Sequence, residues 1–301
     1  MNVLTVVMAL LSAVFNAAAS VLQRRAAVEP DEVSAHGARG ATARLAGLLR
    51  RPYWWGGISA MGLSAVFQVI ALDSGGLAVV QPLLASELLF TLLIGAAVFR
   101  HRPGAGTWWD FLMLAGGLAL FLLAASPSQG GDRAGDWKWL GAGGALACGV
   151  ALLLALALRI RGPLQAAALG LATAACFSVT AALIKEVTAR FPDGFTAVLT
   201  TWHTYAGAAT GLLSVLLLQW TLRAGTLAAS QPALTLGDAL ISVVLGGLLF
   251  GENIAAGWHV LPEVAGVGLM ALGIVGLTRS PAVASGNWDE VPEHRPDVRS
   301  R

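Results

Sequence analysis

Clusters of charged and turn-forming residues divide the chain into long apolar stretches, and this pattern limits its possible folds more than any other feature. An example of such a cluster is Arg100-His101-Arg102-Pro103. A helix needs roughly 20 apolar residues to cross a bilayer. Backbone groups in lipid must also be satisfied within the chain, which favours helices. The sequence therefore predicts an all-α polytopic membrane bundle with nine transmembrane helices, over residues 2–22, 53–72, 77–99, 107–125, 138–158, 164–184, 196–220, 227–250 and 260–278.

Composition excludes a soluble globular domain. Hydrophobic residues make up 56% of the 301 residues and charged residues 12%, about half the share that is usual in soluble proteins. The formal net charge of +2 is too small to indicate a nucleic-acid partner. The expected partner is the lipid bilayer. The charged, proline-containing segment 279–301 is predicted to be a disordered cytoplasmic tail.

Basic residues indicate the orientation of the chain, because Lys and Arg gather on the cytoplasmic side of a membrane. Fifteen of the 19 Lys and Arg residues follow odd-numbered stretches, including those in a predicted loop over residues 23–52, and four lie near the ends of even-numbered stretches. This predicts a multi-pass protein of the cytoplasmic membrane with its N-terminus outside and its C-terminus inside. At the outer ends, Asp73, Lys185 and Glu186 are expected to extend toward water.

The two halves of the sequence resemble each other. A shift of 150 residues aligns 72–84 with 222–234 at seven identities, and a shift of 162 aligns 13–19 with 175–181 at three. We therefore predict a first repeat over 1–125, a connecting helix over 138–158 and a second repeat over 164–278. The displacement is five crossings, so the repeats would be inverted. Inverted repeats are typical of secondary transporters; the alternative is a duplicated packing unit with no role in transport.

The shift also pairs two Gln-Pro dipeptides, Gln81-Pro82 and Gln231-Pro232. Interrupted helices at matching positions of two repeats indicate a transporter's binding region. Proline lacks an N–H group and crowds the carbonyl one turn earlier. Pro82 and Pro232 would therefore either interrupt their helices or begin shorter ones. Gln81 and Gln231 would either bind a polar substrate or satisfy the backbone groups that the prolines leave free.

Each half carries one carboxylate at nearly the same predicted depth. Glu87 lies five residues after Pro82, and Asp238 lies six residues after Pro232. An ionised carboxylate in hydrocarbon is costly unless it faces water, a partner or a proton. Glu87 and Asp238 are therefore candidates for substrate contact or for coupling to a proton or cation, with a purely structural role as the alternative. The one-residue offset turns one side chain by about 100°, so the two need not face each other.

Asn16 and Ser178 are matched by the shift of 162. They are candidates for substrate contact or for hydrogen bonds between helices. The sequence contains no phosphate-binding loop, no HExxH motif and no Ser/His/Asp arrangement of known context. No catalytic residue, metal site or cofactor is predicted, and an enzyme is not expected.

Three segments resemble the drug/metabolite transporter superfamily (EamA-like). They are 71–82 (ALDSGGLAVVQP), its second copy ending in LLFGENI at 248–254, and Gly251-Glu252-Asn253, which is similar to that family's Gly-Glu-Arg/Lys turn. Typical members have ten spans, and the nine-span layout with a basic first loop is similar to the NIPA magnesium-transporter branch. The resemblance implies a secondary transporter that moves a small metabolite or drug-like solute by alternating access. The alternatives are a transporter or channel for Mg²⁺ or another divalent cation, and a non-transporting membrane scaffold or lipid-modifying enzyme.

Overall fold

The computed structural model describes residues 2–28, 52–98, 104–125, 130–224, 227–252 and 260–279. These residues are helical almost throughout, and no strand occurs among them, which confirms the prediction of an all-α chain. The helices are α1 (Val3–Val28), α3 (Pro52–Ser74), α4 (Leu77–Leu84), α5 (Glu87–Val98), α6 (Ala105–Ala125), α7 (Asp136–Ala157), α8 (Pro163–Thr188), the 3-10 turn η1 (Phe191–Asp193), α9 (Phe195–Thr200), α10 (Trp202–Ala224), α11 (Leu227–Phe250) and α12 (Val260–Arg279).

Seven segments of the described chain are helical, long and apolar enough to cross a bilayer. They are Val3–Gln23, Pro52–Ser74, Leu77–Val98, Ala105–Ala125, Asp136–Ala157, Leu164–Asp193 and Pro232–Phe250. The chain is therefore a multi-pass helical membrane protein. Helices α10 and α12 cover the two other predicted spans but fall outside this set. The predicted tail beyond Arg279 and the greater part of the predicted loop 23–52 lie outside the described residues.

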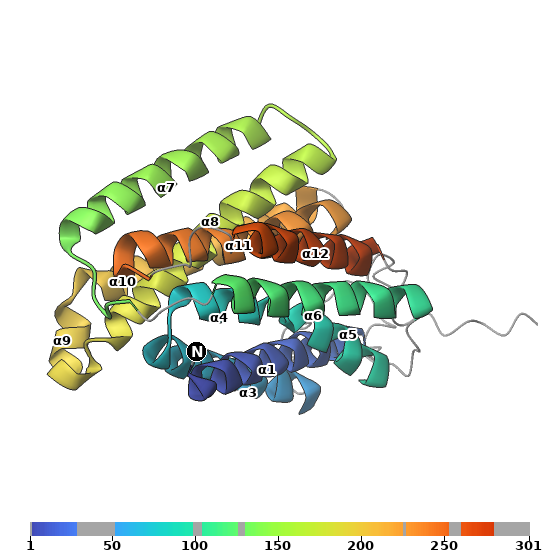
Figure 1. The fold of residues 1–301 in the computed structure, drawn as a ribbon, viewed down its shortest axis with the longest axis horizontal. Helices are drawn as coiled ribbons and strands as arrows, with labels where there is room; N and C mark the ends of the chain where they lie inside the picture. The colour runs from blue at the N-terminus through green and yellow to red at the C-terminus, as the bar shows by residue number, and fades with distance from the viewer. Residues whose placement is uncertain are drawn as a thin grey trace, which may run out of the picture.

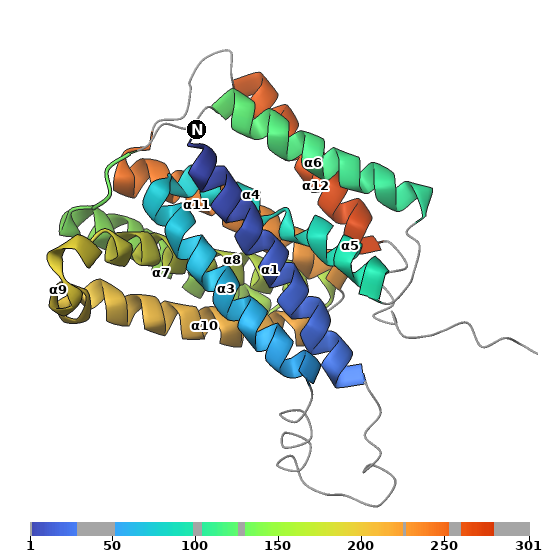
Figure 2. The same cartoon turned by 90° about the horizontal axis from the view of Figure 1, so that it is seen from below.

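The helices pack in pairs that join distant parts of the sequence. Helix α1 lies along α3, and α6 lies along α12 (Figures 1 and 2). Helix α8 packs against both α10 and α11, and α4 packs against α11 and α1. Helix α7 lies at the margin of the bundle and contacts mainly α8 (Figure 1). The central helices α4, α8 and α11 therefore bring the first and second halves of the chain together.

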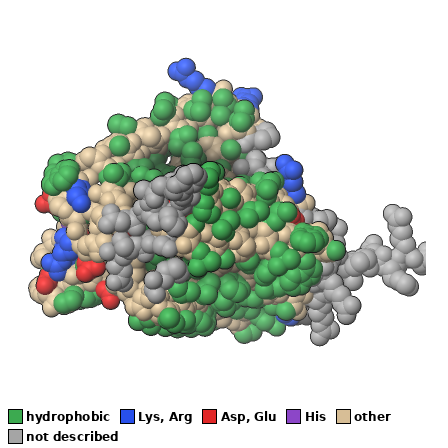
Figure 3. Space-filling view, viewed as in Figure 1, with side chains coloured by type: hydrophobic (Ala, Val, Ile, Leu, Met, Phe, Trp, Pro, Cys, Tyr) green, Lys and Arg blue, Asp and Glu red, His purple; other side chains and the backbone are tan. Residues whose placement is uncertain are grey.

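The described surface carries large apolar areas. In Figure 3, hydrophobic side chains cover much of the lower and right-hand part of the face, and Lys, Arg, Asp and Glu side chains appear near its edges. Large exposed apolar side chains occur on many helices, among them Val66, Leu112, Leu152 and Leu216. So much exposed apolar surface is unfavourable in water. It suits a protein whose middle is surrounded by lipid.

Small residues allow α6 and α12 to approach closely. A Cβ atom on Gly117 would meet the backbone of Gly266 and Met270, and one on Gly266 would meet the backbone of Gly117 and Phe121. In lipid, such close backbone contact is a main source of attraction between helices. Glycine at these positions therefore holds the α6–α12 pair together.

Candidate functional site

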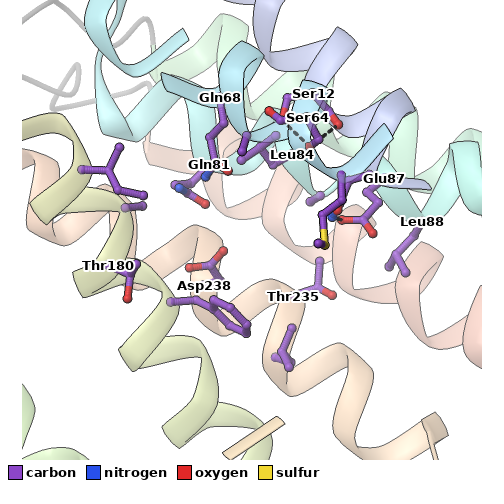
Figure 4. Close-up of a pocket in the computed structure, with 18 residues that line it drawn as sticks. Ser12, Ser64, Gln68, Gln81, Leu84, Glu87, Leu88, Thr180, Thr235 and Asp238 are labelled. Carbon is purple, nitrogen blue, oxygen red and sulfur yellow. Dashed lines mark hydrogen bonds between the residues drawn. The ribbon is translucent and has the colours of Figure 1, made fainter. Parts of the chain in front are cut away.

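A cavity of about 380 Å³, with both polar and apolar lining residues, lies between the two halves of the chain. In Figure 4, Gln68, Gln81 and Glu87 lie on one side of it, and Thr180, Thr235 and Asp238 lie on the other. Apolar side chains complete the walls. The polar lining residues are Ser12, Asn16, Ser64, Gln68, Gln81, Glu87, Thr180, Thr235 and Asp238.

Glu87 reaches the cavity from the start of α5. The span that α4 and α5 form together contains a turn at Ala85 and Ser86, and Glu87 follows this turn as the first residue of α5. Backbone N–H groups through the turn, including those of Ser86 and Leu88, bond carbonyls of the preceding turn. Asn16 of α1 donates a hydrogen bond from Nδ2 to Oε2 of Glu87 over 2.7 Å. The Glu87 side chain is half-buried, so this bond fixes it without closing it off from the cavity.

Asp238 occupies the corresponding place in the second half, on α11. Ser178 of α8 donates a hydrogen bond from its hydroxyl to Oδ1 of Asp238 over 2.7 Å. Ser178 is fully buried, whereas Asp238 is half-buried and lines the cavity. The carboxylate is therefore held from behind by a neutral donor, as Glu87 is.

The four residues form two matched pairs. Self-comparison of the sequence aligns Asn16 with Ser178 and places Glu87 within one residue of Asp238, and the structure bonds each donor to the carboxylate of its own half. The one-residue offset does not turn the carboxylates onto different surfaces, since both line one cavity. The turn at Ala85 and Ser86, which continuous α11 lacks, reorients Glu87 relative to α4.

Neither proline begins its helix. Pro82 lies inside α4 and Pro232 lies inside α11. The first-half span is interrupted three residues after Pro82, whereas α11 continues past Pro232, so the expected interruption occurs in one half only. Gln81 lines the cavity, and the side chain of Gln231 lies outside the described residues.

A second polar cluster lies at the end of the bundle that contains the start of α1. Its centre is Glu252, whose carboxylate accepts hydrogen bonds from the backbone N–H groups of Leu77 over 2.7 Å and Ala78 over 2.8 Å. The Lys185 ammonium lies 2.7 Å from Oε1 of the same carboxylate. Glu252 thus joins the N-terminus of α4 to the ends of α8 and α11.

Glycine makes room for this cluster. Gly251 has a φ of 67°, a backbone conformation that favours glycine at a helix end, and it turns Glu252 back over α11, where the Glu252 N–H bonds the carbonyl of Gly246 over 3.1 Å. A Cβ atom on Gly76, Gly130 or Gly246 would collide with Glu252. We call Glu252, Lys185 and the start of α4 the end cluster.

The expectation that Lys185 and Glu186 extend toward water is wrong. Lys185 is 4% exposed and Glu186 is fully buried. Glu186 accepts hydrogen bonds from the Ala134 backbone N–H over 2.8 Å and from Arg190 over 2.8 Å. The contact comes from Ala134, in the described residues 130–135 before α7, and the sequence gives no signal for it. Asp73 is exposed, as expected.

The ionisable side chains of the cavity lining are acidic. Among the lining residues of the described chain, Glu87 and Asp238 are the ionisable ones, and none is Lys, Arg or His. The described residues also contain no group of three or more His, Cys, Asp or Glu side chains that could hold a metal ion. The site is suited to binding through two carboxylates, with neutral hydroxyl and amide groups around them.

The chain is similar in sequence to a bacterial protein. An uncharacterized protein of Corynebacterium glutamicum is 30% identical over 294 residues, which cover 95% of this chain and 98% of the relative. The chain belongs to the same family as that protein. No family model matches the chain, and no solved structure matches it. The matched residues cover both halves of the chain.

Proposed function

We propose that the protein is a secondary transporter that moves a small solute by alternating access, with the cavity between its halves as the binding site. One observation carries this proposal: two matched carboxylates, each held by a matched neutral donor, face one cavity from the two halves. A carboxylate inside a membrane protein is costly and is most often functional. Two equivalent halves around one central site are the plan of many secondary transporters.

Helix packing supports an inverted repeat of four helices, a connecting helix and four helices. Helix α1 packs on α3 and α5 in the first half, and α8 packs on α10 and α11 in the second. The pairs α6–α12 and α4–α11 join corresponding helices of the two halves. On this plan α10 and α12 also cross the membrane, which gives nine crossings and makes the halves inverted.

The ends of the bundle support the proposed orientation. The four basic residues assigned to the outer side lie at the end where α1 starts. Arg133 pairs with Asp193, Lys138 bonds the Leu249 carbonyl, and Lys185 and Arg190 pair with Glu252 and Glu186. Among the other basic residues of the described chain, Arg25 lies in the last turn of α1, at the opposite end of that helix. The proposed location is the cytoplasmic membrane, with the N-terminus outside and the C-terminus inside.

The end cluster would act as the outer closure in alternating access. Leu77 and Ala78 in the end cluster lie about one helical turn from Gln81 of the cavity lining, and Lys185 follows the lining residue Ile184 directly. Opening the cavity toward this end requires α4 to separate from Glu252. The cluster joins the two halves, so its release would couple their movement.

The resemblance to the drug/metabolite transporter superfamily agrees with this proposal. EamA-like proteins are expected to transport a metabolite or drug-like solute, and a cavity with both polar and apolar walls suits such a solute. The NIPA-like alternative fits less well, because Mg²⁺ prefers octahedral oxygen ligands and retained waters. The described cavity offers two carboxylates on opposite walls.

Alternating access can be tested before the solute is known. In a variant with Cys148 and Cys176 replaced by Ser, a single cysteine is introduced at Thr235 and labelled in vesicles with a membrane-impermeant thiol reagent. We expect labelling from either side, because the cavity opens to each side in turn. A matched cysteine at Leu112, exposed on the apolar surface, should resist the reagent from both sides. Labelling of the Thr235 position from one side alone would contradict the proposal.

A further inference from the structure

We propose that the cavity binds a monovalent, amphipathic organic cation, whose charge lies between Glu87 and Asp238. This inference rests on the proposed transport function and names the chemical class of the solute. It follows from two features of the cavity: the sign of its charge and the nature of its remaining walls.

The charge of the lining selects a cation. An ionised carboxylate has about four acceptor positions. The described chain supplies them with neutral side-chain donors: Asn16 for Glu87, and Ser178 together with Ser242 for Asp238. An anionic solute would be repelled by both carboxylates, and a neutral solute would leave them without a counter-charge. A monovalent cation between them balances one of the two charges, and a proton on the other carboxylate balances the second.

The apolar walls select an organic cation over a metal ion. The lining includes Met61, Leu84, Leu88, Phe177, Ile184 and Leu234. These side chains offer no ligand to a hydrated metal ion, but they can bury the hydrocarbon of an organic cation, at roughly 25 cal/mol per Å² of apolar surface removed from water. The ring of Phe177 can also attract the cation through its face. A volume of about 380 Å³ falls within the usual range for sites of small organic molecules.

Protons would compete with this cation for the same two side chains. Helices α1, α3 and α4 contribute neutral lining residues, as does α8, so Glu87 on α5 and Asp238 on α11 are the ionisable lining residues of the described chain. A monovalent cation balances one carboxylate and a proton balances the other; when the cation leaves, a second proton takes its place, so one proton is exchanged for one cation. Binding should therefore weaken on acidification, and the cation and protons should move in opposite directions.

A pair of probes with the same shape tests the charge requirement. Benzyltrimethylammonium carries a permanent positive charge, and neopentylbenzene has nearly the same shape without it. Binding of each, and of Mg²⁺, is measured by equilibrium dialysis against the full-length protein in detergent. We expect saturable binding of benzyltrimethylammonium. The dissociation constants of neopentylbenzene and Mg²⁺ should be larger by at least about tenfold, equivalent to 1.4 kcal/mol.

Variants assign the effect to the two carboxylates. Glu87→Gln and Asp238→Asn should each weaken binding of benzyltrimethylammonium by about tenfold or more. Asp110→Asn is the matched control, because Asp110 lies on α6 against Gly276 and outside the cavity lining. It should bind as the unmodified protein does. If a carboxylate variant fails to fold, the comparison of probes on the unmodified protein still decides the question.

The outcomes separate the solute class from transport itself. Equal binding of the two isosteric probes, or preferred binding of Mg²⁺, would overturn the organic-cation proposal even if the cysteine at Thr235 is labelled from both sides. Unchanged binding of the cation by Glu87→Gln and Asp238→Asn would also overturn it. One-sided labelling of Thr235→Cys would instead contradict alternating access, whichever probe binds.

Discussion

At the scale of single residues, the site is built from polar side chains whose partners are specific. Self-comparison of the sequence identified Asn16, Ser178, Glu87 and Asp238 as candidates, because polar residues at matched places in two apolar repeats are uncommon. It could not show that each donor bonds the carboxylate of its own half, since that contact depends on how α1 meets α5 and how α8 meets α11.

Asn16 should be a positioning residue for Glu87. Asn16→Ala removes the 2.7 Å hydrogen bond, and we expect it to weaken benzyltrimethylammonium binding about threefold to tenfold, the range for a bond worth roughly 1 kcal/mol. Asn16→Ser, which imitates the second half, should restore part of the affinity. Equal losses for the alanine and serine variants would show that the donor itself is not what matters.

The ion pair of the end cluster should be strongly coupled. Lys185 and Glu252 are 4% and 3% exposed, so removing one charge leaves the other buried and unpaired. We expect Lys185→Met or Glu252→Gln alone to lower the free energy of unfolding by about 3–5 kcal/mol. The double variant should lose less than the sum of the two. Unfolding in mixed micelles measures this, and additive losses would contradict the coupling.

At the scale of helices, the ends and interruptions were the least predictable features. The sequence indicated helices over all nine apolar stretches, and the structure has helix in each. The turn at Ala85 and Ser86 contains neither glycine nor proline, so the sequence pattern points to Pro82 instead. Local sequence also could not show that the segment around Gly130 covers Glu252, because that contact joins residues far apart in the chain.

The end of α11 should depend on a glycine. At a φ of 67°, Gly251→Ala should cost about 1–2 kcal/mol of stability and move Glu252 away from α4. Asparagine tolerates this conformation better than alanine, so Gly251→Asn should be milder. Thermal unfolding of the two variants in detergent makes the comparison. If the alanine variant is as stable as the unmodified protein, the end of α11 does not require a residue with positive φ at position 251.

The α6–α12 contact offers a test with neighbouring glycines. A side chain at Gly117 would collide with the backbone of α12, whereas one at Gly116 would meet nothing within 4 Å. Gly117→Val should therefore destabilise the protein by about 1–3 kcal/mol or more, and Gly116→Val should have little effect. Both can be compared by thermal unfolding. Equal stability of the two variants would mean that α6 and α12 do not depend on close backbone contact.

At the scale of the whole molecule, hydropathy and charge predicted the membrane-spanning character of the chain, because lipid imposes length and polarity on each crossing. They also placed Arg133, Lys138, Lys185 and Arg190 at one end, where the structure has them. They could not predict which helices pair or where the cavity lies. Those features depend on packing between residues that are remote in sequence.

The central claim is that two inverted halves enclose one site. The halves are inverted only if the connecting helix α7 crosses the membrane, so the two ends of α7 must lie on opposite sides. With Cys148 and Cys176 replaced by Ser, single cysteines at exposed Asp132 and Arg161, on either side of α7, are labelled in intact cells with an impermeant thiol reagent. The inverted arrangement predicts labelling of the Asp132 position from outside and of the Arg161 position only after the membrane is opened. Labelling of both positions from the same side would mean that the halves run parallel, and would contradict the proposed transport mechanism.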